Sequence, residues 1–186
     1  WVSWSPALAA PLIWYGAMLS YAGYRLKKPH PHHLALIFTI SLAITTTLLL
    51  VLANPLPSYA HVAGWQLIQT PTIAGIPFMF LAYIAYVLAC YLLPLDLLRR
   101  PAPQPENLLN LDARRRARPW LVAASVLLLL SGIIMARTAL WALHSDQPLM
   151  LSNLSTARTV KQYDLIVASL IGLAAILLGR AIVAYE

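Results

Sequence analysis

Five apolar segments separated by polar or basic stretches make up most of this chain. Each is about 20 residues long and almost free of charge, which is the length that an α-helix needs to cross the hydrocarbon core of a bilayer. The segments cover residues 6–24, 34–53, 73–95, 120–143 and 165–183. The pattern predicts an all-α, polytopic helical membrane bundle of about five transmembrane helices, in a single domain over residues 1–186.

Basic residues gather at alternate ends of these segments. Short loops rich in Lys and Arg stay on the cytoplasmic side of a membrane, so the pattern predicts an N-terminus outside, a cytoplasmic C-terminus and a place in a bacterial inner membrane. Residues 99–118 alone hold six of the thirteen Lys and Arg residues. The predicted cytoplasmic set is Arg25, Lys27, Lys28, Arg99, Arg100, Arg114, Arg115, Arg116, Arg118 and Arg180, and the predicted outer set is Arg137, Arg158 and Lys161.

Composition agrees with this class of protein. The chain is 60% hydrophobic and only 10% charged, whereas soluble domains contain about 25% charged residues. The net charge of +7 does not indicate a nucleic-acid partner, because the basic residues lie at the ends of apolar segments. The single Cys90 excludes an intramolecular disulfide and Cys-paired zinc sites. The chain begins at Trp1 without the charged start of a signal peptide, and we expect it to be part of a longer polypeptide.

Small residues spaced four apart predict helix-packing faces, because they let two helix backbones approach closely. The last apolar segment carries two such pairs, so we expect it to mediate self-association, either in a homodimer or within a larger membrane complex. The predicted packing residues are Gly16 with Ser20, Ala168 with Gly172, and Ala175 with Gly179.

Two tyrosines of the third segment, Tyr83 and Tyr86, are three residues apart and share a helix face. A buried tyrosine hydroxyl needs a hydrogen-bond partner, and the threonines at 45–47 are candidates. The pair fits either helix packing or one wall of a small ligand cavity.

A cavity of this kind would lie toward the outer leaflet, lined by Tyr83, Tyr86, Arg137 and Asp164. Arg137 lies near the outer end of the fourth segment, where its charge must reach water or pair with a carboxylate such as Asp146 or Asp164. Asp164 directly precedes the last segment and is placed like a helix N-cap. The sequence leaves lipid, quinone or pigment open as ligands and predicts no bound cofactor.

Three histidines, His30, His32 and His33, lie in a basic loop stiffened by two prolines. A metal site usually adds carboxylates or Cys in a fixed geometry, so the sequence favours a solvated loop that faces phosphate groups and predicts no metal. No histidine lies at mid-membrane, where haem b would need facing pairs. No Ser–His, paired Asp or His–Glu set lies at membrane depth either, so we expect no enzymatic activity from this sequence.

The last segment also carries a resemblance. The stretch from Lys161 through Tyr163 and Asp164, ending LLGRAIVAYE at Glu186, resembles the last membrane helix of multi-spanning sensor histidine kinases from photosynthetic and related bacteria. The loops at 54–59 and 113–120 look similar to the corresponding loops of that family. The resemblance implies a membrane-spanning sensory or anchoring region that leads into a cytoplasmic effector. This sequence contains neither the phospho-accepting histidine nor the ATP-binding motifs, so it implies no active kinase here.

Two functions remain open on the sequence. The first is a sensory or anchoring module that passes a signal through its last helix to a cytoplasmic effector. The second is a non-catalytic accessory subunit of a respiratory or photosynthetic membrane complex, binding lipid, quinone or pigment. A transporter is disfavoured, because the sequence shows neither an internal repeat nor a charge at mid-membrane.

Overall fold

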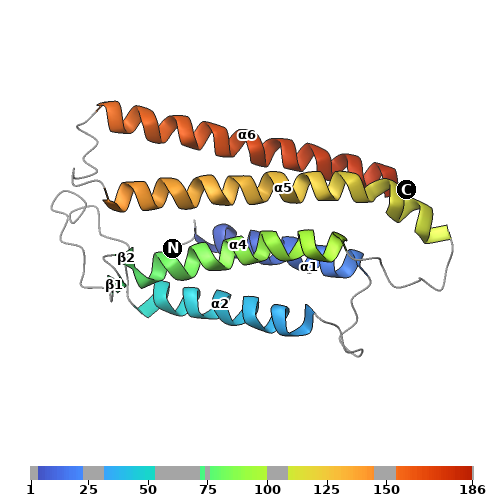
Figure 1. Cartoon of the computed structure of the whole chain (residues 1–186), viewed down its shortest axis with the longest axis horizontal. Helices are drawn as coiled ribbons and strands as arrows, with labels where there is room; N and C mark the ends of the chain where they lie inside the picture. Colours follow the sequence, from blue (N-terminus) through green and yellow to red (C-terminus); the bar gives the residue numbers. More distant parts are fainter. Residues whose placement is uncertain are drawn as a thin grey trace.

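The computed structural model describes residues 4–22, 32–52, 72–73, 76–99, 109–144 and 154–185. The described part of the chain is a helical bundle whose helices run alternately in opposite directions (Figure 1). A two-stranded antiparallel ladder precedes the third described helix. The elements are α1 (Trp4–Tyr21), α2 (His32–Leu52), β1 (Thr72–Ile73), β2 (Ile76–Pro77), α4 (Phe78–Arg99), α5 (Leu109–His144) and α6 (Leu154–Tyr185).

The alternation brings five helix termini together at one end of the bundle. Helices α1, α4 and α6 end there, and α2 and α5 begin there (Figure 1). We call it the basic end, because it contains Arg99, Arg114 to Arg116, Arg118 and Arg180. The opposite end, called the far end, contains Arg137, Arg158 and Lys161.

Among the described residues, four helices are long and apolar enough to cross a membrane. The apolar part of α1, Ala7–Tyr21, is shorter than the other four. The bundle leaves much of this apolar surface outside, since only 11% of the residues of the α6 span are buried and no more than 39% of any other. A surface of this kind suits contact with lipid or with a protein partner. The four spans are His32–Leu49, Phe80–Arg99, Asp112–Thr138 and Lys161–Ala184.

Helix α4 holds the bundle together, since it packs against α1, α2 and α5. Two clusters of buried side chains fill these contacts. At the basic end, Tyr15 and Met18 of α1 meet Leu97 of α4, Leu121 of α5 and Ala181 of α6. Toward the far end, the second cluster joins α4 to α1 and α2, and its buried members are Tyr86, Val87 and Cys90.

Helix α4 begins at Phe78, later than the predicted residue 73, which belongs to β1 instead. Two other helices begin earlier than the sequence pattern predicts. Helix α5 starts at Leu109 rather than near residue 120, and Pro119 therefore lies inside the helix. The preceding residues are mostly leucine, alanine and arginine, which are strong helix formers. Figure 1 shows the first turns of α5 bending away from the rest, as expected where a proline removes a backbone hydrogen bond. Helix α6 starts at Leu154, so the predicted N-cap role of Asp164 is wrong.

Helix α6 packs most extensively with α5. The buried or half-buried positions Val167, Leu170, Ala174, Leu177 and Ala181 recur every three or four residues along one side of α6. That spacing is typical of a helix–helix seam. The face of α6 that serves as this seam is therefore made of medium-sized and small apolar residues rather than of the predicted small pairs.

The predicted small-residue pairs lie on open surface. Ala168, Gly172, Ala175 and Gly179 are all exposed, and a side chain added at either glycine would meet no atom within 4 Å. In α1, Gly16 likewise has nothing within 4 Å and Ser20 is exposed. Within this chain these residues do not form helix contacts, so their packing role stays a prediction about contact with another chain.

Candidate functional site

The structure separates the four residues predicted to line one ligand cavity. Tyr86 is fully buried, and its hydroxyl donates a hydrogen bond to the Leu8 carbonyl of α1. Tyr83 packs half-buried against the same cluster. The Thr46 hydroxyl donates instead to Leu42 of its own helix, at 2.8 Å, so the predicted tyrosine–threonine pairing is not made by this residue. Tyr86 thus joins α4 to α1.

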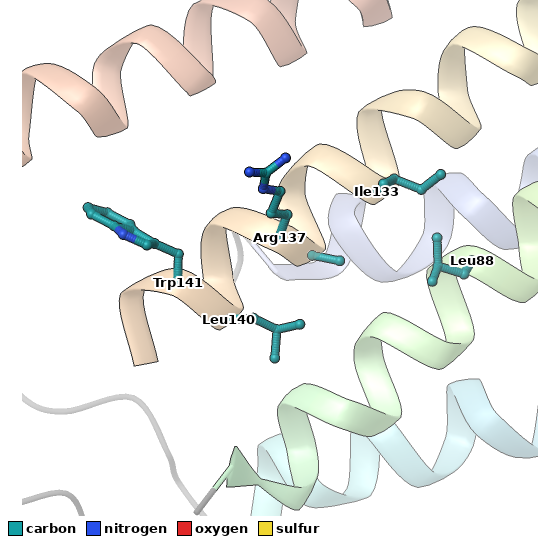
Figure 2. A pocket seen from close by; sticks show the side chains of 6 residues that line it. Leu88, Ile133, Arg137, Leu140 and Trp141 are labelled. Atoms are coloured by element: carbon teal, nitrogen blue, oxygen red, sulfur yellow. The ribbon is translucent and has the colours of Figure 1, made fainter. Parts of the chain in front are cut away.

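Arg137 lines a different cavity at the far end. This groove lies between α4 and α5, and its volume is about 560 Å³. Figure 2 shows Leu88 on the α4 side, with Arg137 and Trp141 on α5. Asp164 is exposed on α6 and is not one of the lining residues. The residues that line it, here called the Arg137 groove, are Leu88, Ile133, Ala136, Arg137, Leu140 and Trp141.

A buried histidine at the basic end joins three helices. His32 is the first residue of α2 and is only 3% exposed. Its Nδ1 is hydrogen-bonded to the hydroxyl of Tyr15 in α1 at 3.3 Å. Its Nε2 lies 3.4 Å from Oδ2 of Asp96 in α4, a distance suited to an ion pair but long for a hydrogen bond. We call these three residues the His32 network.

The helix dipoles explain why His32 and Asp96 suit each other. A positive charge is unfavourable at a helix N-terminus, and a negative charge is unfavourable near a C-terminus. His32 begins α2, and Asp96 lies in the last turn of α4. Asp96 and a protonated His32 each meet an unfavourable dipole in their own helix and a complementary group across the contact. The side chain of Asp96 is 49% exposed, so this contact reaches the edge of the bundle.

Two residues of α5, Arg114 and Arg118, make further polar contacts at the same end. The Tyr21 hydroxyl of α1 donates to the Arg114 carbonyl at 2.6 Å, and the Arg114 guanidinium lies 6.0 Å from the centre of the Tyr21 ring. Arg118 donates from Nε to the Leu98 carbonyl at 2.9 Å and from a terminal nitrogen to the Arg99 carbonyl at 3.3 Å. The last carbonyls of a helix have no partner within the helix, so Arg118 caps α4. Polar side chains thus join α1, α2, α4 and α5 at the basic end.

The sequence did not reveal the His32 network. The loop histidines were predicted to be solvated, and this is wrong for His32, although His33 is exposed and His30 lies outside the described residues. The one sequence feature that could have indicated burial of His32 is its position just before an apolar segment. Its partners, Tyr15 and Asp96, are 17 and 64 positions away, and only the packing of α1 and α4 brings them to it.

The described residues contain no group of three or more His, Cys, Asp or Glu side chains arranged to hold a metal ion. Asp146, a predicted partner of Arg137, lies outside the described residues. Searches against protein-family models, curated proteins and solved structures found no match. The described part of the chain thus offers two candidate sites, the His32 network at the basic end and the Arg137 groove at the far end.

Proposed function

We propose that this chain is a membrane-embedded sensory or anchoring module that passes a signal through α6 to a cytoplasmic effector. The proposal includes five membrane spans, an outer N-terminus and a cytoplasmic basic end. Helix α1 serves as the fifth span, since its 18 residues reach about 27 Å, close to the hydrocarbon thickness of about 30 Å. The alternating helix directions and the arginines at the basic end support this orientation (Figure 1).

The observation that carries the proposal is the difference between α6 and the rest of the bundle at the basic end. Polar side chains connect α1, α2, α4 and α5 there. Helix α6 joins this end through the buried Ala181, while its neighbours Arg180, Ile182 and Val183 are exposed. A signal needs an element with two arrangements that differ in free energy. Helix α6 is suited to this role, because it can shift along its apolar seam without breaking those polar contacts.

The proposal is tested on the native polypeptide extracted from its membrane. The intact mass of the polypeptide is measured together with the proteins that co-purify with it. A cysteine introduced at Val183 tests whether thiol reagents added on the cytoplasmic side reach the end of α6. We expect labelling from the cytoplasmic side and an effector domain, either on the same polypeptide or bound to it. Labelling from the outer side would refute the orientation. A polypeptide of 20.5 kDa without an effector would refute the signalling role.

The exposed apolar surface of α6 favours a second function, that of an accessory subunit of a respiratory or photosynthetic membrane complex. Such subunits contact larger partners and lipids over much of their surface, and α6 leaves most of its span exposed. Co-purification of the 20.5 kDa polypeptide with such a complex would support this alternative over the first. A visible absorption spectrum of the purified protein tests for a bound pigment.

A further inference from the structure

The spacing of basic residues on α5 indicates at what depth in a membrane the Arg137 groove would lie. Arg137 follows Arg118 by 19 residues, and the residues between them carry no charge. At a rise of about 1.5 Å per residue this segment is about 29 Å long, which matches a hydrocarbon core of about 30 Å. When Arg118 lies at one edge of the hydrocarbon core, Arg137 therefore lies at the other edge, from where its long side chain reaches the lipid phosphates.

Helix α6 repeats the same spacing in the opposite direction. Lys161 and Arg180 are also 19 residues apart. Lys161 lies seven residues from the start of α6, and Arg137 lies seven residues from the end of α5. Since the two helices are antiparallel and packed together, Arg137 and Lys161 share one level, and Arg118 and Arg180 share the other. Two independent helices thus give the same membrane boundaries.

The groove itself is apolar and opens beside one positive charge. Leu88, Ile133, Ala136 and Leu140 give it an aliphatic lining. Figure 2 shows the Arg137 guanidinium extending away from Leu88 and Leu140, so the charge stands at the rim of the groove. Trp141 lines the same groove one turn farther toward the far end, and tryptophan is common at membrane–water interfaces. Arg137 makes no ion pair with any residue in the part of the chain that the structure describes.

We propose that the Arg137 groove binds one anionic phospholipid, with its phosphate on Arg137 and an acyl chain along Leu88 and Ile133. An acyl chain matches the aliphatic lining in shape and polarity, and a guanidinium can bind two phosphate oxygens at once. The acyl chain enters the bilayer from the headgroup level, which is the depth that the Arg137 side chain reaches. A neutral ligand would fill the apolar part but would leave the arginine at the rim without an anion. This inference concerns the far end and does not rest on the signalling role of α6.

Native mass spectrometry of the full chain in mild detergent tests the proposal. The protein is mixed with phosphatidylglycerol or with phosphatidylcholine of the same acyl chains, and the retained lipid is counted. We expect about fivefold greater retention of phosphatidylglycerol, which corresponds to the roughly 1 kcal/mol that one basic residue contributes near an anionic lipid surface. The Arg137→Gln variant should retain both lipids equally.

Lys161→Gln is the matched control, because it removes a positive charge at the same depth on a helix that does not line the groove. It should leave the preference for phosphatidylglycerol unchanged. Ala136→Phe should reduce the retention of both lipids by filling the groove, while circular dichroism checks that the helices remain. Equal retention of the two lipids by the unaltered protein would overturn the proposal, as would an equal loss in the Lys161→Gln and Arg137→Gln variants.

Discussion

Replacing His32 by alanine should weaken the basic end of the bundle more than any exposed substitution near it. The imidazole is 3% exposed, so its removal leaves a cavity, at the lower end of the range of about 2–5 kcal/mol for large-to-small changes. The contacts to Tyr15 and Asp96 add less, because hydrogen bonds between membrane helices average about 0.6 kcal/mol. The half-exposed Asp96 carboxylate is also partly screened by water. We therefore expect a total loss of about 3 kcal/mol.

The assay is the thermal unfolding of the purified protein in one detergent, followed by circular dichroism. For a chain of this size about 1 kcal/mol lowers Tm by roughly 2–4 °C, so His32→Ala should lower Tm by about 6–12 °C. His33→Ala is the matched control, since it removes the same side chain from the next position, where it is exposed. Asp96→Asn should lower Tm less than His32→Ala, because asparagine keeps a polar group of the same size at this half-exposed position. An equal change of Tm in the His32 and His33 variants would refute the structural role of the buried imidazole.

Three further predictions concern helix contacts. Gly132→Ala should be tolerated, because an added Cβ lies 3.4 Å from the nearest α4 atoms, whereas Gly132→Ile should cost about 1–3 kcal/mol in an unfolding assay. The double substitution of Gly172 and Gly179 by isoleucine should reduce self-association in a membrane two-hybrid assay. It should leave Tm nearly unchanged, because neither glycine has a neighbour within 4 Å. Unchanged self-association would contradict the packing prediction. Arg118→Ala should speed amide hydrogen exchange in the last turn of α4, because it removes the 2.9 Å bond to the Leu98 carbonyl, and the exposed Arg116→Ala is the control.

Helix length was harder to predict than helix position. The apolar pattern located all five described helices, because a segment that cannot leave its backbone unsatisfied in lipid must form a helix. It did not locate the starts of α5 and α6, which begin at Leu109 and Leu154. Both early turns contain charged residues that hydropathy excludes from a membrane span, although helix propensity favours them. Hydropathy therefore reports where the apolar part of a helix begins, and not where the helix begins.

The sites required information that no local pattern contains. Arg137 was singled out from its charge near a segment end, and it does line a cavity. Its neighbours in that cavity differ from those predicted, because Tyr83 and Tyr86 belong to the contacts of α4 with α1 and α2. A tyrosine pair on one helix face looks the same in sequence whether it faces a cavity or a neighbouring helix. The crossing of α4 with its partners decides between the two.

By itself, the sequence determined the helical class, four of the five predicted spans and the clustering of basic residues at alternate segment ends. These properties follow from the transfer free energy of each segment, which depends on composition and length alone. Only the tertiary structure decided that His32 is buried between Tyr15 and Asp96 and that the small residues of α6 face outward. Both depend on how helices rotate and cross as they pack. The rotation and crossing of helices are set by contacts between residues far apart in the chain. The hydropathy of a single segment contains no information about these contacts.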